Sequence, residues 1–201
     1  ISGRKISFND YTLIKLKSLI NNKINDKNAI LLTTSGTTAN PKFVRISKKN
    51  IFENTYQIQK YLKINQKQKT ITTLPMAYSY GLSIINTHLE FGAKIYLNEV
   101  SPVNVKFWQI VKNQKITNFS TVPQICDFLK RIKFEKFLKK NIKYLAVAGG
   151  RTNFETLKYI NNVCKFNKIN FFVMYGQTEA SPRMSYIDVT KNNKIKSIGK
   201  P

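Results

Sequence analysis

The feature that most constrains the fold is a regular alternation of short apolar runs with longer segments of helical character. The apolar runs are rich in Ile, Val, Leu and Phe, and turn residues bound them. Strands that are apolar throughout are buried on both faces, and the helices between them provide that cover. The alternation therefore predicts an α/β fold, with a doubly wound, mainly parallel sheet and helices on both of its faces.

The pattern also predicts where the elements lie. Strand-like or alternating segments are expected at 29–32, 42–46, 70–74, 94–97, 116–122, 142–148, 170–174 and 194–198. Helices are expected at 10–23, 48–61, 82–91, 102–112, from 123 onward, at 134–138 and at 153–164. Ser47 is a natural N-cap, and Pro123 suits the first position of a helix. In doubly wound sheets, ligands bind beyond the carboxyl ends of the strands, so the loops after residues 32, 74, 148 and 174 are the candidate site.

Composition supports a folded protein and suggests its compartment. The 201 residues are 42% hydrophobic and 22% charged, enough for one large core or two small ones. No apolar run approaches the length of a membrane span, and the first residues lack a secretory profile. Cys126 and Cys164 stand apart without metal-type spacing, so we expect buried thiols in the cytoplasm. His88 is the only histidine, which excludes a site built from several histidines.

The net charge of +24, from 34 Lys and Arg against 10 Asp and Glu, leaves nucleic-acid binding as one alternative. The lysines are scattered, however, and no arginine-rich run, zinc pattern or helix-turn-helix pattern is present. This distribution favours a general basic character over a dedicated nucleic-acid surface. Such a charge attracts anionic ligands over long range.

A loop rich in hydroxyl groups follows the first apolar strand. Residues 33–42 read Thr-Thr-Ser-Gly-Thr-Thr-Ala-Asn-Pro-Lys. Dense hydroxyl and backbone N–H groups suit a polyanion, because phosphate oxygens accept several hydrogen bonds at once. The loop is not a Walker-type loop, which has a second glycine directly before a Lys-Ser/Thr pair. A surface loop that happens to be rich in Ser and Thr is the alternative.

A second polar stretch, Tyr175-Gly176-Gln177-Thr178-Glu179, follows the apolar run 170–174. The glycine allows a sharp turn, and the aromatic ring beside it offers a flat face for a purine. One carboxylate together with phosphate oxygens is a usual magnesium arrangement. Taken alone, the stretch is also what a strand end with a turn looks like.

Together the two stretches resemble motifs of the adenylate-forming (AMP-binding) superfamily, which includes acyl-CoA synthetases, amino-acid-activating domains and luciferases. The first stretch is similar to the family's phosphate loop but has Ala39 and Phe43 where glycines are usual. The second is similar to the Y-G-x-T-E motif at every fixed position. The stretches 75–81, 149–151 and 199–201 resemble, in turn, a segment lining the acyl pocket, a glycine pair beside the adenine and a G-[KR]-P segment. Tyr78 stands where histidine is common.

The resemblance implies a role for each matching residue. Catalytic roles fall to Lys42, Thr178 and Glu179, with Glu179 also holding the metal. The implied nucleotide-binding residues are Thr34, Ser35, Gly36, Thr37, Thr38, Lys42, Gly149, Gly150, Arg151, Tyr175, Gly176, Gln177 and Thr178. The implied substrate pocket contains Tyr78, Tyr80 and Gly81.

The resemblance also implies a reaction. A small carboxylic acid attacks ATP with Mg²⁺ to give an acyl-adenylate, and CoA or the pantetheine thiol of an acyl carrier protein then takes the acyl group. It implies further that residues 1–201 form the central part of a large nucleotide-binding domain, with an amino-terminal portion and a carboxyl-terminal lid outside them. The alternative, from a function class other than enzymes, is a remnant that binds a nucleotide without catalysis.

Overall fold

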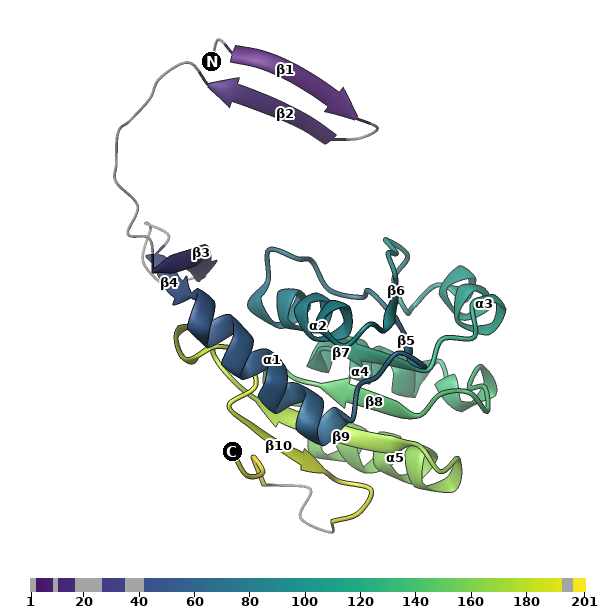
Figure 1. Ribbon diagram of the computed structural model, residues 1–201. Helices are drawn as coiled ribbons and strands as arrows, with labels where there is room; N and C mark the ends of the chain where they lie inside the picture. Colours follow the sequence, from purple (N-terminus) through teal and green to yellow (C-terminus); the bar gives the residue numbers. More distant parts are fainter. Residues whose placement is uncertain (1–2, 9–10, 17–26, 35–41, 193–196) are drawn as a thin grey trace.

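The computed structural model describes residues 3–8, 11–16, 27–34, 42–192 and 197–201, and five helices and ten strands lie within them (Figure 1). The strands are β1 (Gly3–Phe8), β2 (Tyr11–Leu16), β3 (Asn28–Thr34), β4 (Lys42–Ser47), β5 (Lys69–Ile71), β6 (Lys94–Tyr96), β7 (Asn118–Thr121), β8 (Tyr144–Val147), β9 (Asn170–Tyr175) and β10 (Ser185–Asp188). The helices are α1 (Lys48–Leu62), α2 (Ser79–Glu90), α3 (Val105–Asn113), α4 (Pro123–Arg131) and α5 (Phe154–Phe166). Two short 3-10 helices are η1 (Phe134–Lys136) and η2 (Thr178–Ala180).

A six-stranded sheet in the order β10-β9-β8-β7-β5-β6 forms the centre of the protein. Strands β5 to β9 pair in parallel, and β10 joins the edge of β9 antiparallel. The mainly parallel α/β prediction is therefore confirmed. The antiparallel edge strand was not predicted, because its four residues, Ser-Tyr-Ile-Asp, alternate too briefly to give a strand signal.

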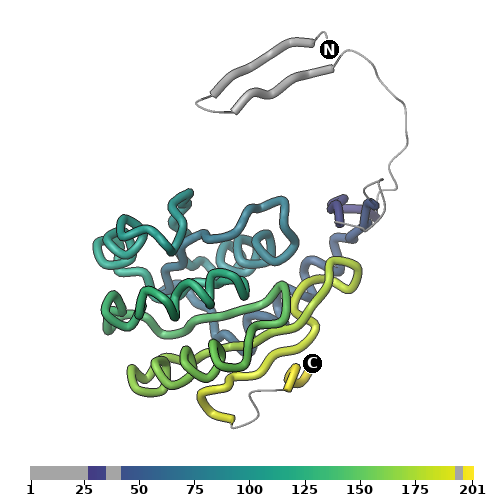
Figure 2. The backbone as a smooth tube through the Cα atoms, turned by 180° about the vertical axis from the view of Figure 1, so that it is seen from behind, coloured from purple at the N-terminus to yellow at the C-terminus, as the bar shows by residue number. Residues whose placement is uncertain are grey.

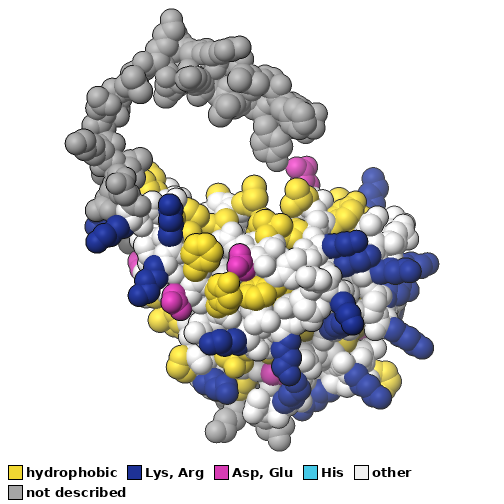
Figure 3. Space-filling model, in the orientation of Figure 1, with side chains coloured by type: hydrophobic (Ala, Val, Ile, Leu, Met, Phe, Trp, Pro, Cys, Tyr) yellow, Lys and Arg dark blue, Asp and Glu magenta, His cyan; other side chains and the backbone are white. Residues whose placement is uncertain are grey.

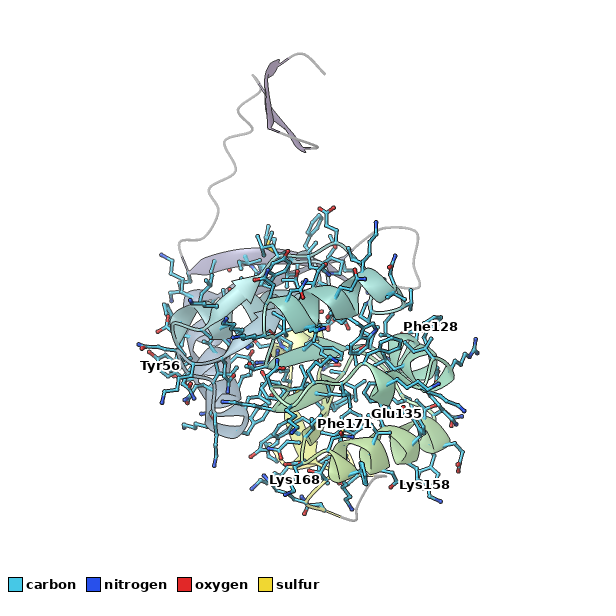
Figure 4. The ribbon with its side chains drawn as sticks, turned by 90° about the vertical axis from the view of Figure 1, so that its right-hand side faces the viewer. Tyr56, Phe128, Glu135, Lys158, Lys168 and Phe171 are labelled. Atoms are coloured by element: carbon cyan, nitrogen blue, oxygen red, sulfur yellow. The ribbon has the colours of Figure 1, made fainter. Side chains whose placement is uncertain are left out.

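Two apolar clusters fill the two faces of this sheet, so the sheet is doubly wound (Figures 1 and 2). Alternate residues of each strand point to opposite faces. On β8, Leu145 and Val147 join the cluster beneath α3, α4 and α5, whereas Tyr144 and Ala146 join the cluster beneath α1 and α2. Phe171 on β9, labelled in Figure 4, is fully buried in the first cluster.

Local sequence explains where the helices begin. The Ser47 side chain accepts from the Asn50 backbone N–H at 3.1 Å and caps α1, as predicted. Pro123 is the first residue of α4, a position where its missing N–H costs no hydrogen bond. Asn153 caps α5 by accepting from Glu155. Helix α3 begins at Val105 behind its Asn104 cap, so the prediction of a helix from residue 102 is three residues too long.

Three other predictions fail on the described residues. Tyr11–Leu16 is a strand paired with β1, so the predicted helix 10–23 is wrong there, because six residues are too few to distinguish a helical period from a strand period. Its remaining residues lie outside the described ranges. The predicted helix 134–138 is a short 3-10 turn. Ser197 and Ile198 are not in a strand, and the rest of the predicted strand 194–198 lies outside the described residues.

Strand β3 does not belong to the main sheet. It pairs antiparallel with β4 in a separate two-stranded ribbon, in which Thr34 is opposite Lys42. The expectation that the hydroxyl-rich loop leaves a strand of the parallel sheet is therefore wrong, since an apolar run alone does not reveal its pairing partner. The buried side chains of the ribbon, Leu32 and Ile46, line a pocket together with residues of α1 and α2.

The side chains on the surface agree with the charge analysis. Lys and Arg side chains are spread over the visible face among apolar and uncharged groups (Figure 3). Glu135, labelled in Figure 4, accepts a hydrogen bond from the Tyr159 hydroxyl, and this contact ties η1 to α5. No helix within the described ranges is long and apolar enough to span a membrane.

Candidate functional site

A small cavity lies at the carboxyl edge of the parallel sheet. It forms where β8 and β9 end and where the chain enters α2. The lining residues come from three stretches distant in sequence, namely Tyr78, Ser79 and Tyr80, then Ala148 and Gly149, then Gly176, Gln177, Thr178, Pro182 and Arg183. The structure therefore brings together parts of three of the four loops that were predicted to form the site, those after residues 74, 148 and 174. Most of the fourth, after residue 32, lies outside the described residues.

The end of β8 meets the predicted pocket aromatic directly. Gly149 has φ +89°, and a Cβ atom at that position would lie 2.4 Å from the Tyr78 hydroxyl oxygen. Only glycine combines this backbone conformation with such close approach. Tyr78 is 37% exposed and therefore offers part of its ring to the cavity. The glycine at this strand end is thus required by the packing of the site.

The end of β9 is packed just as closely against the segment 181–183. A Cβ atom on Gly176 would lie 2.3 Å from the backbone nitrogen of Arg183. The same segment is anchored from the other side, since the Asn54 side chain of α1 donates to the Pro182 carbonyl at 2.6 Å. The wall of the cavity is thereby fixed between a strand and a helix that are far apart in sequence.

A hydroxyl contact joins α2 to the 3-10 turn η2. The Ser79 and Thr178 hydroxyl oxygens lie 3.1 Å apart. Ser79 is the first residue of α2, and no side chain caps that end of the helix. The free backbone N–H groups of a helix N-terminus and two hydroxyl groups together offer hydrogen-bond donors to an anion in the cavity.

Other predicted residues lie outside the lining of this cavity. Tyr175, Glu179, Gly150 and Arg151 are exposed and do not line it. Of the residues that do line it, Gly149 and Gln177 are exposed and Thr178 is partly buried. Lys42 is exposed at the start of β4, and β4 contacts η2. Gly81 is buried beneath the Pro75 carbonyl, where a Cβ atom would lie 2.2 Å from the oxygen, so packing requires it and it does not line the cavity. The predicted phosphate-loop residues Ser35, Gly36, Thr37 and Thr38, with Ala39, lie outside the described residues.

Buried aromatic side chains and a histidine lie on the α1 and α2 side of the sheet. Burial raises the pKa of the Tyr80 and Tyr144 hydroxyls and lowers the pKa of His88 to about 4. The His88 Nδ1–H donates to the Ile84 carbonyl at 2.7 Å, because a carbonyl accepts only. The Tyr144 hydroxyl is 3.5 Å from His88 Nε2. His88 is therefore a neutral packing residue.

Sequence reasoning missed four residues of the cavity: Ser79, Ala148, Pro182 and Arg183. Ser79 is an unremarkable serine between two tyrosines in the sequence. Arg183 carried a weak signal, since it is one of few arginines in a lysine-rich chain and comes four residues after Glu179. The position of Arg183 depends on the chain returning along β9 to form β10, and no local sequence pattern predicts that return.

Within the described ranges, no group of three or more His, Cys, Asp or Glu side chains is arranged to hold a metal ion. A hard cation such as Mg²⁺ accepts ligands from substrate phosphates and water, and one carboxylate suffices on the protein. The exposed Glu179 carboxylate, on the turn η2 beside the cavity, fits that arrangement. The donor set therefore suits a metal brought in by a nucleotide, and it does not suit a resident metal centre.

Comparisons with known proteins agree with the motifs. The AMP-binding enzyme model matches residues 11–201. The chain is 27% identical to the 2-succinylbenzoate–CoA ligase of Listeria innocua over 175 residues, which are 87% of this chain and 36% of that protein. It is 29% identical to the medium-chain acyl-CoA ligase ACSF2, mitochondrial, of Mus musculus, covering 83% of this chain and 28% of that protein. The chain spans about a third of the length of the curated relatives it matches.

The same fold occurs in solved structures. The o-succinylbenzoate CoA synthetase (MenE) of Bacillus subtilis, in complex with the acyl-adenylate intermediate OSB-AMP, superposes with a TM-score of 0.76 at 22% identity. The match covers 88% of this chain and 35% of that one. That synthetase has also been solved in complex with ATP and a magnesium ion, with a TM-score of 0.74. At this level of identity, the likeness establishes the fold.

Proposed function

The chain belongs to the AMP-binding enzyme family, and from that premise we propose that it provides the nucleotide-binding part of an AMP-forming ligase. The ligase activates a small carboxylic acid with ATP and passes the acyl group to CoA or to the pantetheine thiol of a carrier protein. The single observation that supports this most is the cavity where Tyr78, Gly149, Gly176 and Thr178 meet at the ends of parallel strands. The names of the relatives, which are acid–CoA ligases, support the reaction class.

The reaction needs positioning more than acid–base chemistry. A carboxylate oxygen attacks the α-phosphorus of ATP, the new P–O bond forms, and the bond to pyrophosphate breaks. The chain's contribution is to hold the two reactants in line and to offset phosphate charge. Thr178 donates its hydroxyl to the α-phosphate, and Lys42 with the loop before it binds the outer phosphates. Gly149 and Gly176 let the strand ends pack closely against Tyr78 and Arg183, and this packing shapes the walls around the adenine and the acid.

Glu179 would hold Mg²⁺, which neutralises phosphate charge during the transfer. Its carboxylate lies on η2, one residue from Thr178, so the metal and the α-phosphate would be bound by the same turn. The remaining ligands come from phosphate oxygens and water. The cytoplasm, where ATP and reduced thiols are available, is the compartment we propose.

The extent of the chain is part of the proposal. We propose that residues 1–201 belong to the large nucleotide-binding domain, and that the residues which grip the ribose and the catalytic lid lie elsewhere in the protein. A nucleotide-binding protein without ligase activity is the second candidate. It is favoured by Ala39 and by Phe43, whose side chain is 64% exposed at the start of β4.

The direct test is an equilibrium titration of AMP and Mg-ATP with the full-length protein and with Lys42→Ala, Thr178→Ala and Glu179→Gln. Each variant should weaken Mg-ATP binding by roughly 10- to 100-fold, because a charge-assisted hydrogen bond contributes about 1.5–3 kcal/mol. Glu179→Gln should leave AMP binding nearly unchanged, since AMP binds without the metal.

Matched controls lie on exposed positions away from the cavity, Lys49→Ala on α1 and Glu99→Gln after β6. Both should bind like the wild type. ATP–pyrophosphate exchange with a panel of acids then separates the two candidate functions. Nucleotide binding without exchange for any acid favours the non-catalytic candidate, and unchanged binding in all three site variants contradicts the nucleotide site.

A further inference from the structure

Arg183 is a buried cation without an anionic partner among the described residues. It is 7% exposed, and its Nε, Nη1 and Nη2 atoms are buried without a hydrogen-bond partner. The one ion pair within the described ranges joins Lys191 to Asp188. Buried charges in proteins are usually paired, because removing a charge from water is costly. A buried guanidinium that no anion among the described residues neutralises is a suitable partner for an anionic ligand.

The side chains around Arg183 do not neutralise it. Its guanidinium carbon lies 5.0 Å from the centre of the Tyr80 ring. Its charge also reaches Tyr61, Tyr144 and His88, since it opposes the rise in the tyrosine pKa values and lowers the histidine pKa further. All of these groups are neutral at pH 7, so they offer ring faces and hydroxyl groups but no negative charge.

The backbone holds Arg183 in place at a conformational cost. Arg183 has φ +69° and Ser181 has φ +62°, a region that side chains other than glycine rarely adopt. The contact with Gly176 and the hydrogen bond from Asn54 to Pro182 fix this conformation from both sides. Strained residues that the surrounding structure holds in place cluster at binding sites. The position of the cation is therefore imposed by the fold.

The cation belongs to the wall of the cavity at the strand ends. Arg183 and Tyr80 line it together with Gly149, Gly176 and Thr178. The Tyr80 hydroxyl is also buried, and no described residue forms a hydrogen bond with it. A guanidinium fork and a phenol O–H at the same wall supply donors that match the two oxygens of a carboxylate.

We propose that Arg183 is a specificity-determining residue that selects acids carrying a second carboxylate. This inference rests on the proposed function, since it concerns the acid that the ligase activates. One carboxylate of the substrate reacts at the phosphate end of the cavity, and the other pairs with Arg183 and Tyr80. An acid with a plain aliphatic chain leaves the Arg183 guanidinium and the Tyr80 hydroxyl unpaired and places apolar carbon against a cation. Binding of such an acid is therefore disfavoured.

The test compares two acids of the same carbon number, adipate and hexanoate, in the full-length protein. Variants are Arg183→Met, which removes the charge at similar length, and Arg183→Lys, which keeps the charge but loses the fork. Arg131→Met, an exposed arginine at the end of α4, is the control. Two readouts are needed: ATP–pyrophosphate exchange with each acid, and direct calorimetric binding of each acid without nucleotide.

The wild type and Arg131→Met should favour adipate over hexanoate by at least 10-fold in kcat/KM and in binding. Arg183→Met should abolish or reverse this preference, and Arg183→Lys should retain part of it. Arg183→Met should also raise Tm by a few degrees, because the uncompensated charge is gone. If Arg183→Met loses stability but keeps the preference for adipate, Arg183 has only a structural role. That result overturns the inference.

The two proposals fail separately. If no acid supports exchange but adipate binding still depends on Arg183, the ligase proposal fails and the carboxylate site stands. If hexanoate and adipate are activated equally in the wild type and in Arg183→Met, the proposed ligase activity is supported. The proposed selection by Arg183 of acids with a second carboxylate is then wrong. Absence of adipate binding and of adipate-dependent exchange in the wild type also overturns the inference.

Discussion

The hydroxyl oxygens of Ser79 and Thr178 lie 3.1 Å apart, although the two residues are 99 positions apart in the sequence. This contact joins the start of α2 to the turn that carries Glu179. Each hydroxyl that donates to a phosphate needs a defined orientation, and a neighbouring hydroxyl that accepts or donates provides it. The pair is therefore the structural link between the predicted acid pocket and the predicted phosphate contact.

Removal of the Ser79 hydroxyl should weaken nucleotide binding through Thr178. We expect Ser79→Ala to reduce AMP affinity by about 3- to 10-fold, in keeping with one hydrogen bond worth about 0.5–1.5 kcal/mol. Ser83→Ala is the control, since its hydroxyl donates to the Tyr80 carbonyl within the same helix. Equal affinities for the two variants, measured by titration calorimetry, would show that the Ser79 contact has no role in binding.

Glycine at the end of β9 should be irreplaceable for packing. Gly176→Ala places a methyl group 2.3 Å from the Arg183 nitrogen, which is backbone and cannot rotate away. We expect a loss of about 1–3 kcal/mol in the free energy of unfolding, as in other overpacked sites. Gly150→Ala is a milder comparison, because its Cβ would lie 3.3 Å from a ring carbon of Pro123. Urea denaturation of both variants checks the difference, and similar midpoints contradict it.

Asn54 should stabilise the segment that presents Arg183. Asn54→Ala removes the donor to the Pro182 carbonyl, so we expect a loss of about 1 kcal/mol. The preference between adipate and hexanoate should narrow as well, because the segment loses its anchor on α1. Asn162→Ala, at an exposed position on α5, is the matched control and should change neither property. If Asn54→Ala changes the stability but not the acid preference, the hydrogen bond from Asn54 to Pro182 does not contribute to acid selection.

Stability should rise with pH between 5 and 7 because of His88. Its pKa is about 4 in the folded protein, below the ordinary value of 6.5, so the unfolded chain binds the proton first as pH falls. The contribution of this group is therefore fully present above about pH 7 and is lost progressively toward pH 4, with a full span of about 3 kcal/mol.

The measurement is the urea midpoint at several pH values between 5 and 7, where carboxylates scarcely titrate. His88→Asn should flatten the slope in this interval, since the chain has no other histidine. The difference in urea midpoint between His88→Asn and the wild type at pH 7.5 gives the loss of stability that does not depend on pH, and it is subtracted at each lower pH. An equally steep slope in the variant would assign the effect to another group.

The fold class and six of the ten cavity-lining residues were predictable from the sequence, because they depend on local patterns. Alternating apolar runs gave the parallel strands β5, β7, β8 and β9, and Ser47 and Pro123 marked the helix starts. The motif around Thr178 was found as a string of residue types. The predicted helix 10–23 was wrong at residues 11–16, because helical and strand periods cannot be told apart in so short a window.

What the sequence determined by itself is the type of chemistry: a run of hydroxyls, glycines at strand ends and one carboxylate indicate a phosphate ligand. What only the tertiary structure decided is pairing and burial. The sequence does not reveal that β3 joins β4 and not the main sheet, or that β10 returns along β9. It also does not reveal that Arg183 is buried beside Tyr80 with no anionic partner in the part of the chain that the structure describes. The physical reason is that burial and charge compensation depend on contacts between distant segments, and no local pattern records those contacts.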